Sequence, residues 1–394
     1  MRTLSGLMVF LLVFCTGISA RIEWETPNGE VVSQHRQGDF DRAVVAANKA
    51  LQVAEQAVGP DHPEVAQILR NLAALYKAQV RYARAEPLYK RALAIDEKAY
   101  GLEHPEVATD LNSLAELYRT QGRYAQAEPL YRRSLAIREE SLGPKDSAVA
   151  TSLNNLAELY RTQGQYAEAE PLYKRALAID EKAYGPDHPN VAPMLNNLAL
   201  LCYLHGQYAQ AEPLWKRSLA ICEKALGPDH PAVATSLKNL GELCRAQGQY
   251  AQAEPLHKRS LAIREKALGP DHPDVAQSLN YLAELHRAEG QYAQAEPLCK
   301  RSLAIREKAL GPDHPDLAAS LNTLAELYRA QGQYAQAEPL HKRSLAIREK
   351  ALGPDHPDVA QSLENMAALY RKSGREKEAE ALESRAAAIR AMKR

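Results

Sequence analysis

Apolar residues recur at helical spacing along most of the chain, in pairs of segments separated by short polar breaks. In one such unit, the first segment carries apolar side chains at Val107, Leu111, Leu114, Ala115 and Tyr118. The second segment carries them at Tyr124, Ala127, Leu130, Tyr131, Leu135 and Ile137. Gly122 lies between the segments and can adopt the left-handed conformation that ends helices. The unit is therefore predicted to be a hairpin of two antiparallel helices, and strands are not expected because no window alternates apolar and polar residues.

This two-helix unit repeats every 42 residues, the step from His62 to His104. A His-Pro pair marks the step at His62, His104, His188, His230, His272, His314 and His356, and the remaining slot holds Asp146. An alanine keeps the same step at Ala85, Ala127, Ala169, Ala211, Ala253, Ala295, Ala337 and Ala379. Residues 245–279 are also identical to residues 329–363. A period of about 20–50 residues is typical of stacked repeats, whose units bury their apolar faces only against their neighbours.

The turn between hairpins has a recurring sequence, Gly-Pro-Asp-His-Pro. The glycine can end one helix, and the second proline suits the first turn of the next, because the N–H that it lacks would have no partner there. We therefore assign the histidine to the turn. Equivalent histidines in stacked helical layers would lie on the order of 10 Å apart, too far to share a metal ion, so no metal or other cofactor is expected.

The spacing of Leu111, Leu114, Ala115, Tyr118, Ala127 and Tyr131 resembles the tetratricopeptide repeat. That repeat usually runs about 34 residues. The strings at residues 153–157, 166–172 and 185–189 are similar to the 42-residue version found in kinesin light chains. The resemblance covers residues 40–389 and implies an all-α fold, a right-handed superhelical α-solenoid of stacked antiparallel helix pairs. It does not imply a motor function, because this chain lacks the heptad coiled coil of the light chains.

The ends of the chain depart from the repeat. Residues 1–20 combine Arg2, an apolar run and Ala20, a pattern typical of a secretory signal peptide, so we expect export to the periplasm or outside the cell. An uncleaved N-terminal membrane anchor is the alternative. Residues 21–39 are predicted to form a degenerate N-terminal segment, 40–61 a capping helix and 62–374 the repeat array. Residues 375–394 are predicted to form a C-terminal capping helix, because Glu376 and Glu383 replace tyrosines and suit a water-facing end.

Charge and motifs narrow the class of function. Lys and Arg together number 49, as do Asp and Glu, so the formal net charge is zero and nucleic acid is not an expected partner. After the N-terminal run no second apolar segment suggests a membrane span. The sequence contains no Gly-rich phosphate loop, no H-E-x-x-H and no G-x-S-x-G, and its acidic residues repeat with the scaffold. We therefore expect a protein that is not an enzyme.

Four cysteines follow the N-terminal run. Cys202, Cys244 and Cys299 occupy slots that hold Tyr or Trp in other repeats, so we predict that they are small core residues. Cys222 stands where other repeats have a charged residue and is expected to be exposed. The spacing argues against a disulfide framework, and the absence of C-x-x-C argues against a zinc site.

A polar stripe follows the first helix of each hairpin. In one repeat it consists of Thr109, Asn112, Glu116 and Arg119, whose spacing places them on one face, away from the apolar residues. Stacking would align these stripes along a concave wall. In the light-chain repeats that this chain resembles, first-helix Asn residues hold the cargo backbone, which implies that role for Asn112, Asn154, Asn196, Asn280 and Asn322.

The neighbouring columns complete a candidate groove. Its charged residues, which can pair with carboxylates or bases of a ligand, are Glu116, Glu158, Arg119, Arg161, Arg245, Arg287 and Arg329. Leu200 and Tyr203 replace Glu and Arg and predict an apolar pocket in the wall. We hypothesise a protein-interaction scaffold that binds an extended peptide or partner helix of acidic or mixed charge. Two alternatives stay open: the Glu–Arg pairs only solvate the helix, or the protein is a structural repeat protein that self-associates without a dedicated peptide ligand.

Overall fold

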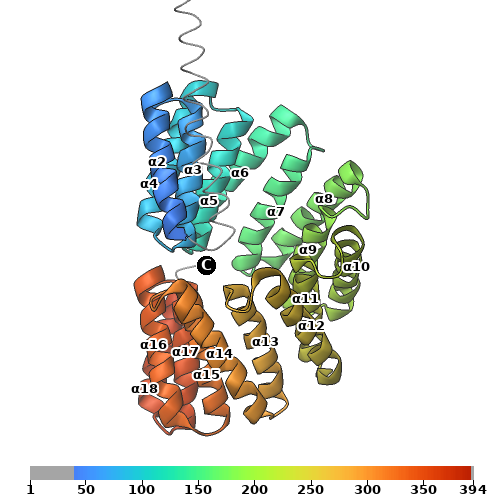
Figure 1. The fold of residues 1–394 in the computed structure, drawn as a ribbon, viewed down its shortest axis with the longest axis vertical. Coiled ribbons are helices and arrows are strands. Elements are labelled where there is room, and N and C mark those ends of the chain that lie inside the picture. Colours follow the sequence, from blue (N-terminus) through green and yellow to red (C-terminus); the bar gives the residue numbers. More distant parts are fainter. Residues whose placement is uncertain (1–39, 392–394) are drawn as a thin grey trace, which may run out of the picture. The chain divides into compact units, whose positions relative to one another are not determined.

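The computed structural model describes residues 40–391, whose regular structure consists of helices without strands (Figure 1). The helices are α2 (Phe40–Val58), α3 (Pro63–Ala78), α4 (Tyr82–Tyr100), α5 (Pro105–Thr120), α6 (Tyr124–Leu142), α7 (Ser147–Thr162), α8 (Tyr166–Tyr184), α9 (Val191–Leu204), α10 (Tyr208–Leu226), α11 (Pro231–Ala246), α12 (Tyr250–Leu268), α13 (Pro273–Ala288), α14 (Tyr292–Leu310), α15 (Pro315–Ala330), α16 (Tyr334–Leu352), α17 (Pro357–Lys372) and α18 (Glu376–Ala391). The predicted all-α fold of consecutive packed helix pairs is confirmed. The predicted signal peptide and the segment at 21–39 lie outside the described residues.

The chain divides into two compact units, one ending at Pro144 and the other beginning at Lys145. The first unit contains α2 to α6 and the second contains α7 to α18. Within each unit, every helix packs against its neighbours in sequence, and the first helix of one hairpin also contacts the first helix of the next. The polar stripes of consecutive first helices therefore lie side by side within a unit.

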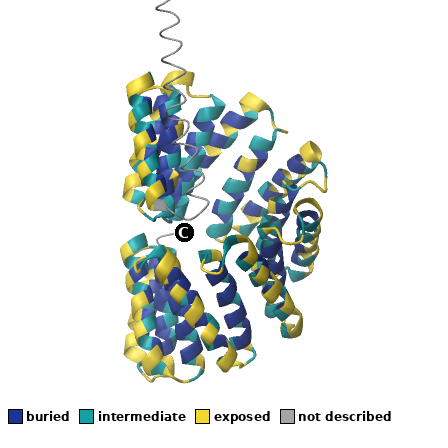
Figure 2. Cartoon of the chain, viewed as in Figure 1, coloured by how far each residue is buried: buried dark blue, intermediate teal, exposed yellow. Residues whose placement is uncertain are grey.

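The core of each unit lies between adjacent hairpins, where Figure 2 shows the buried residues. In the first unit, Val107 and Leu111 of α5 cluster with Ile137 of α6 and with Leu93, which comes from α4 of the preceding hairpin. Burying a side chain of this size contributes about 1.5–3 kcal/mol to stability. Because Leu93 belongs to another hairpin, a single hairpin cannot complete this cluster.

The recurring histidine caps the N-terminus of the first helix. Its Nδ1 atom accepts the backbone N–H of the residue two positions later, at 3.1–3.3 Å, in the turns of His62, His104, His188, His230, His272, His314 and His356. The proline after the histidine occupies the first turn in six of these helices. At the odd slot, the Asp146 carboxylate accepts the Ala148 N–H at 2.8 Å. The assignment of the histidine to the turn is therefore confirmed.

Two turns depart from this pattern. α9 begins at Val191, two residues later than its counterparts, because Pro193 has no N–H to donate to the Pro189 carbonyl. In the turn inside the first hairpin, Val80 has φ 60°, whereas the equivalent Gly122 has φ 70° at no steric cost. A β-branched residue in this region is strained, so the first hairpin has a less favourable turn than the others.

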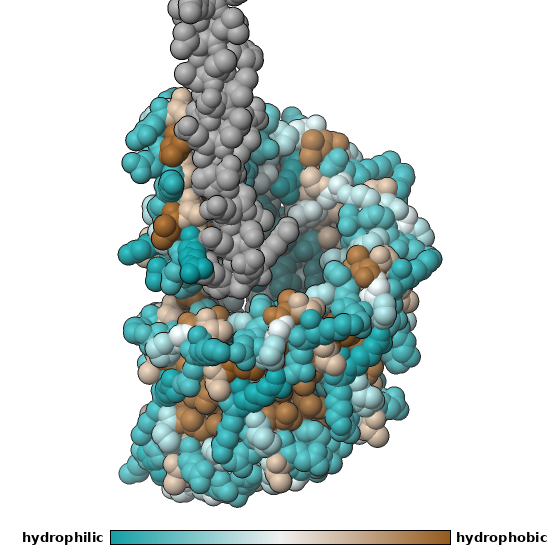
Figure 3. Space-filling model, in the orientation of Figure 1, coloured by the Kyte–Doolittle hydropathy of each residue, from teal (hydrophilic) through white to brown (hydrophobic). Residues whose placement is uncertain are grey.

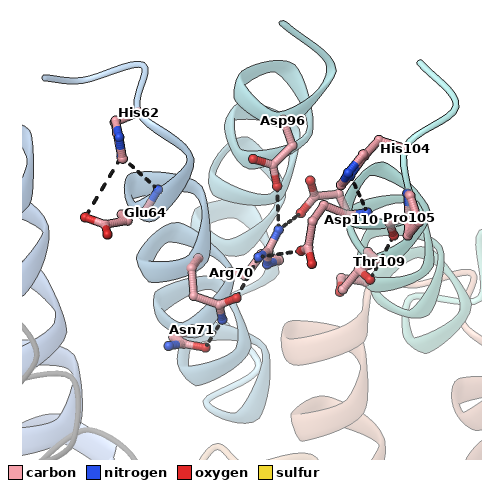
Figure 4. Close-up of polar contacts among 12 residues, drawn as sticks. His62, Glu64, Arg70, Asn71, Asp96, His104, Pro105, Thr109 and Asp110 are labelled. Carbon is pink, nitrogen blue, oxygen red and sulfur yellow. Dashed lines mark hydrogen bonds and ion pairs between the residues drawn. The ribbon is translucent and has the colours of Figure 1, made fainter. Parts of the chain in front are cut away.

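A column of mostly polar residues lies between hairpins, near the end of the second helices from α4 to α16; its residues are buried except Arg348, which is half-buried. We call it the junction column, and it consists of Asp96, Arg138, Asp180, Cys222, Arg264, Arg306 and Arg348. In the first unit, the Arg70 guanidinium of α3 donates to Asp96 of α4 at 2.7 Å and to Asp110 of α5 at 2.9 Å (Figure 4). Burial raises the pKa of Asp110 to about 7, although Arg70 opposes that shift. One buried cation thus joins three helices of two hairpins.

From residue 264 onward, the column consists of arginines. Arg264 donates to the Ser278 hydroxyl at 2.8 Å and to the Asp274 carbonyl at 3.3 Å, both on the next first helix. Arg306 and Arg348 make the same pair of contacts one and two repeats later. Each guanidinium therefore ties the end of one hairpin to the start of the next.

The expectation that Cys222 is exposed is wrong, because the whole slot faces the next hairpin and Cys222 is only 2% exposed. Cys202 and Cys299 are buried, and Cys244 is half-buried. Asp180 occupies the same column without an arginine opposite, because Asn154 stands in the slot of Arg70, which binds Asp96 two repeats earlier. Among the described residues, Asp180 Oδ1 has no hydrogen-bond partner, and burial raises the pKa of Asp180 to about 6.

Substitution of the cap tests its contribution. We expect His230→Ala to lower the free energy of unfolding by about 1 kcal/mol, because the Ala232 N–H loses its acceptor. His230→Asp reproduces the arrangement at Asp146, where the residue at the same helical position is also alanine, and should retain wild-type stability. Urea titrations monitored by circular dichroism would compare the three proteins. Equal losses for both variants would show that the side chain does not act as a cap.

Asp180 gives a pH-dependent prediction. An acid whose pKa is raised in the folded state costs stability as the pH rises from its unfolded value near 4 through its folded value near 6. We therefore expect Asp180→Asn to stabilise the protein by about 2 kcal/mol at pH 8 and to have little effect at pH 4. Urea midpoints at the two pH values would measure the difference. Asp187→Asn is the control, since the Asp187 side chain is 69% exposed, and it should show no such pH dependence.

Candidate functional site

The stripe residues lie on consecutive first helices, as their spacing predicts. Asn112, Glu116 and Arg119 lie on α5 of the first unit. The second unit carries the other predicted residues: Asn154, Glu158 and Arg161 on α7, Asn196, Leu200 and Tyr203 on α9, Arg245 on α11, Asn280 and Arg287 on α13, and Asn322 and Arg329 on α15. On the face of the molecule in Figure 3, the surface is mainly hydrophilic with small separate hydrophobic patches.

The Glu and Arg of the stripe form a bidentate ion pair within one helix. Arg119 donates its Nε and Nη2 protons to the two oxygens of Glu116, at 2.9 and 2.8 Å. The second helix of the same hairpin completes the group, because the buried Tyr131 hydroxyl donates to Glu116 at 2.8 Å. Burial alone would raise the pKa of Glu116, but these donors outweigh it and hold the pKa below its usual range.

This Glu–Arg–Tyr group, which we call the triad, recurs with changes in its third member. Tyr173 donates to Glu158 at 2.8 Å, whereas His257 and His341 place Nε2 at 3.4 and 3.5 Å from Glu242 and Glu326. In the last hairpin the carboxylate moves to the second helix, where Glu383 binds Arg371 at 2.7 Å. The arginine keeps a carboxylate partner in each of these arrangements. Much of the charge along the stripe is therefore neutralised within the hairpin.

The α13 hairpin lacks a complete triad. Cys299 replaces the tyrosine, and Arg287 Nε has no hydrogen-bond partner within the described part of the chain. Burial raises the pKa of Glu284, and Glu242 on the neighbouring first helix adds to the shift. This hairpin is thus less fully neutralised than those around it.

The asparagine column is largely occupied by contacts inside the protein. Asn280 and Asn322 are each 7% exposed; Asn280 donates to Ser320 at 3.1 Å, and Asn322 Oδ1 lies 3.1 Å from His341 Nδ1. Asn154 accepts from Asn197 at 2.8 Å, and Asn112 is half-buried. Asn196 Oδ1 has no hydrogen-bond partner among residues 40–391, and the same holds for Asn280 Oδ1.

The α9–α10 hairpin replaces the triad with apolar and aromatic residues. Leu200 and Tyr203 stand where the Glu and Arg stand elsewhere, and Trp215 takes the tyrosine slot. The Tyr203 and Trp215 rings lie 5.7 Å apart, and Leu200 packs against the same cluster. Trp215 is 1% exposed, yet its indole N–H has no acceptor among the described residues, since the glutamate that would accept it is Leu200. Comparison of equivalent positions in the repeats identifies Leu200 from the sequence. The unpaired indole N–H of Trp215 is found only in the structure.

Metal binding and membrane insertion can be checked against the described residues. Residues 40–391 contain no group of three or more His, Cys, Asp or Glu side chains that could hold a metal ion. No helix within that range is both long enough and apolar enough to cross a membrane.

The family of this chain is identified by a match to its repeat. The tetratricopeptide repeat matches the chain at residues 31–98, 78–140, 148–214, 194–266, 242–296, 274–350 and 321–391. The chain belongs to the tetratricopeptide repeat family. The family predicted from the motif and period is thereby confirmed.

Similarity of this tetratricopeptide repeat protein to curated proteins is confined to a short stretch. It is 42% identical to nephrocystin-3 from Homo sapiens and 43% identical to nephrocystin-3 from Mus musculus, each over 53 residues. The match spans 14% of this chain and 4% of those proteins, so the chain covers a small part of their length.

Solved structures show the same fold. A Rap protein complexed with Competence and Sporulation Factor is 16% identical, with a TM-score of 0.63 over 94% of this chain and 99% of that one. Aspartyl phosphate phosphatase F from Bacillus subtilis is 16% identical, with a TM-score of 0.54 over 93% of each chain. A putative kinesin light chain from Podosopora anserina with nearly identical TPR-like repeats is 33% identical over 52% of this chain and 97% of that chain, with a TM-score of 0.42.

The triad makes a testable contribution to stability. We expect Tyr131→Phe to lower the free energy of unfolding by about 1.5–3 kcal/mol, because a buried bond to a charged carboxylate is lost. Tyr89→Phe is the matched control: Ala74 stands in its glutamate slot and offers no carboxylate, so the change should stay within about 0.5 kcal/mol. Chemical unfolding of both variants measures the difference. Similar losses would mean that the hydroxyl of Tyr131 contributes nothing specific.

Proposed function

We propose that this protein is a scaffold that captures an extended peptide or partner helix along the first helices of its second unit. Membership of the tetratricopeptide repeat family supports the general role of protein–protein interaction. The finer proposal concerns α7, α9 and α11, whose stripes lie side by side.

The observation that carries the proposal is the apolar break in the stripe on α9. On α7 and α11, the Glu158–Arg161 and Glu242–Arg245 pairs satisfy each other. On α9, between these two helices, Leu200 and Tyr203 are half-buried. Their side chains are apolar and aromatic at the positions where α7 and α11 carry charged side chains. An apolar side chain of a ligand contributes most binding free energy where it contacts such a patch. The surrounding polar residues disfavour positions of the peptide in which that side chain would face charge.

Two unsatisfied polar atoms accompany this patch. Trp215 carries an indole N–H, and Asn196 an amide oxygen, that have no partner in the described part of the chain. Both atoms are buried beside the patch, so a ligand reaches them only when the Leu200 and Tyr203 side chains shift as it binds. A peptide backbone offers both a carbonyl acceptor and an N–H donor, and can then supply what each atom lacks. Leaving such groups without partners costs about 1–3 kcal/mol each, which favours occupancy.

Charge further specifies the partner. Arg287 on α13 has an Nε without a partner within residues 40–391, and Lys238 on α11 lies among the stripe residues. These cations favour a ligand of acidic or mixed charge. We place the partner among exported proteins, because residues 1–20 have the pattern of a signal peptide.

The test grafts the neighbours' ion pair onto α9. In the double variant Leu200→Glu and Tyr203→Arg, α9 should carry the pair seen on α7, and Trp215 should gain an acceptor. A displayed library of random peptides, panned against both proteins, should yield peptides with one large apolar residue and nearby acidic residues for the wild type. We expect the double variant to bind the same peptides at least tenfold more weakly.

Leu226→Glu serves as the control, since Leu226 is 40% exposed at the end of α10, outside the stripe. This variant should bind the same peptides as tightly as the wild type. Equal binding by the wild type and the double variant would exclude α9 as the binding site. A wild type that enriches no peptide but grows in mass with concentration during sedimentation would instead favour self-association.

A further inference from the structure

A pocket of about 530 Å³ opens between α10, α11 and α12, in the second unit. Its walls include Leu240 and Leu243 of α11, and its polar lining includes Glu212 and Lys216 of α10 and Gln249. Cys244 lies in the lining and is half-buried. This volume is in the range of about 300–1,000 Å³ that small-molecule sites occupy.

In other hairpins a tyrosine fills the equivalent place. Cys244 occupies the slot of Tyr118, Tyr328 and Tyr370, each a whole number of 42-residue steps away. Each of these tyrosines donates its hydroxyl proton to a glutamate on the preceding second helix, at 3.0 Å to Glu86, 3.2 Å to Glu296 and 3.1 Å to Glu338. The phenol ring thus bridges two hairpins.

The partners of the missing tyrosine are still present around the pocket. Glu212 is the counterpart of Glu86, and Lys216 is the counterpart of Lys90, which forms an ion pair with that glutamate. Lys216 likewise lies 2.6 Å from Glu212. Gln249 occupies the slot of Arg123, whose guanidinium lies 4.2 Å from the centre of the Tyr118 ring. All three counterparts line the pocket. A site built for a phenol therefore lacks only the phenol.

At the equivalent positions one repeat earlier and one repeat later, the tyrosine is replaced by other contacts. Cys202 is one repeat earlier but only 4% exposed, since Trp215 and Tyr203 pack into its cluster. His286, one repeat later, bonds through Nδ1 to Gln291 at 2.8 Å. At Cys244 the short thiol side chain leaves the space open.

We propose that this pocket binds a small molecule that carries a phenol ring. The ring occupies the place of the absent tyrosine side chain, and its hydroxyl donates to Glu212. Apolar substituents of the ligand lie against Leu240 and Leu243. The pocket is separate from the stripe, because on α11 the stripe uses Lys238, Glu242 and Arg245, none of which lines it. Leu240 and Leu243 also pack in the cluster that contains Leu200, Tyr203 and Trp215, so the pocket and the apolar patch lie on two sides of one core.

The test uses 4-methylphenol, the tyrosine side chain as a free molecule. Titration of the full chain, followed by ligand-observed NMR and thermal unfolding, should show saturable binding and a rise in melting temperature. Cys244→Tyr should abolish both, because the new side chain occupies the pocket, and Cys244→Ala should preserve both. Binding that persists unchanged in Cys244→Tyr would overturn the proposal.

The role of the hydroxyl is tested separately. With 4-methylanisole, which has no hydroxyl proton, we expect binding at least tenfold weaker, and Glu212→Gln should reduce the preference for the phenol. Equal binding of the two probes would show a nonspecific aromatic cavity and contradict the proposal. If Cys244→Tyr does not fold, labelling of the Cys244 thiol gives an independent reading: 4-methylphenol should slow the reaction, and an unchanged rate would rule against occupancy.

Discussion

No hairpin in this protein can bury its apolar face alone. Leu93 closes the cluster around Leu111 from the preceding hairpin, and the same dependence recurs along each unit. Stability therefore resides in the junctions between repeats more than in the repeats themselves. Alanine recurs without change at one fully buried position of each second helix from α4 to α18, that of Ala127.

Because each hairpin contacts mainly its immediate neighbours, one changed residue alters the contacts within its hairpin or at one junction. Leu200 removes an acceptor and leaves the Trp215 N–H unsatisfied in the adjoining helix. Cys244 removes a ring and leaves Glu212, on the preceding hairpin, without a phenol. The two candidate sites thus arise in the same way. One residue differs from its counterparts in the other repeats, while the residues that those counterparts contact are unchanged.

The helices, their pairing and the place of the histidine in the turn could be predicted from the sequence, because period and turn chemistry fix them locally. The bond that its Nδ1 accepts from the next helix was found only in the structure. The burial of Asn280 and Cys222 could not be predicted. Spacing along one helix tells which residues share a face, but it does not tell how far that face is covered by the next hairpin. A polar column is equally compatible with an open wall and with a hydrogen-bonded junction. The bonds from Asn280 to Ser320 and from Arg264 to Ser278 show the second arrangement.

The identity of residues 245–279 and 329–363 has a consequence for how such an array changes length. A crossover between the two copies would excise two repeats and leave a chain in which the sequence 245–279 is unchanged and is followed by Glu364 in place of Asn280. Arg348 would then serve the junction that Arg264 now serves, with the same serine hydroxyl and carbonyl as acceptors. Gene recombination could therefore shorten or extend the scaffold in whole steps while the arginine contacts at the new junction are kept.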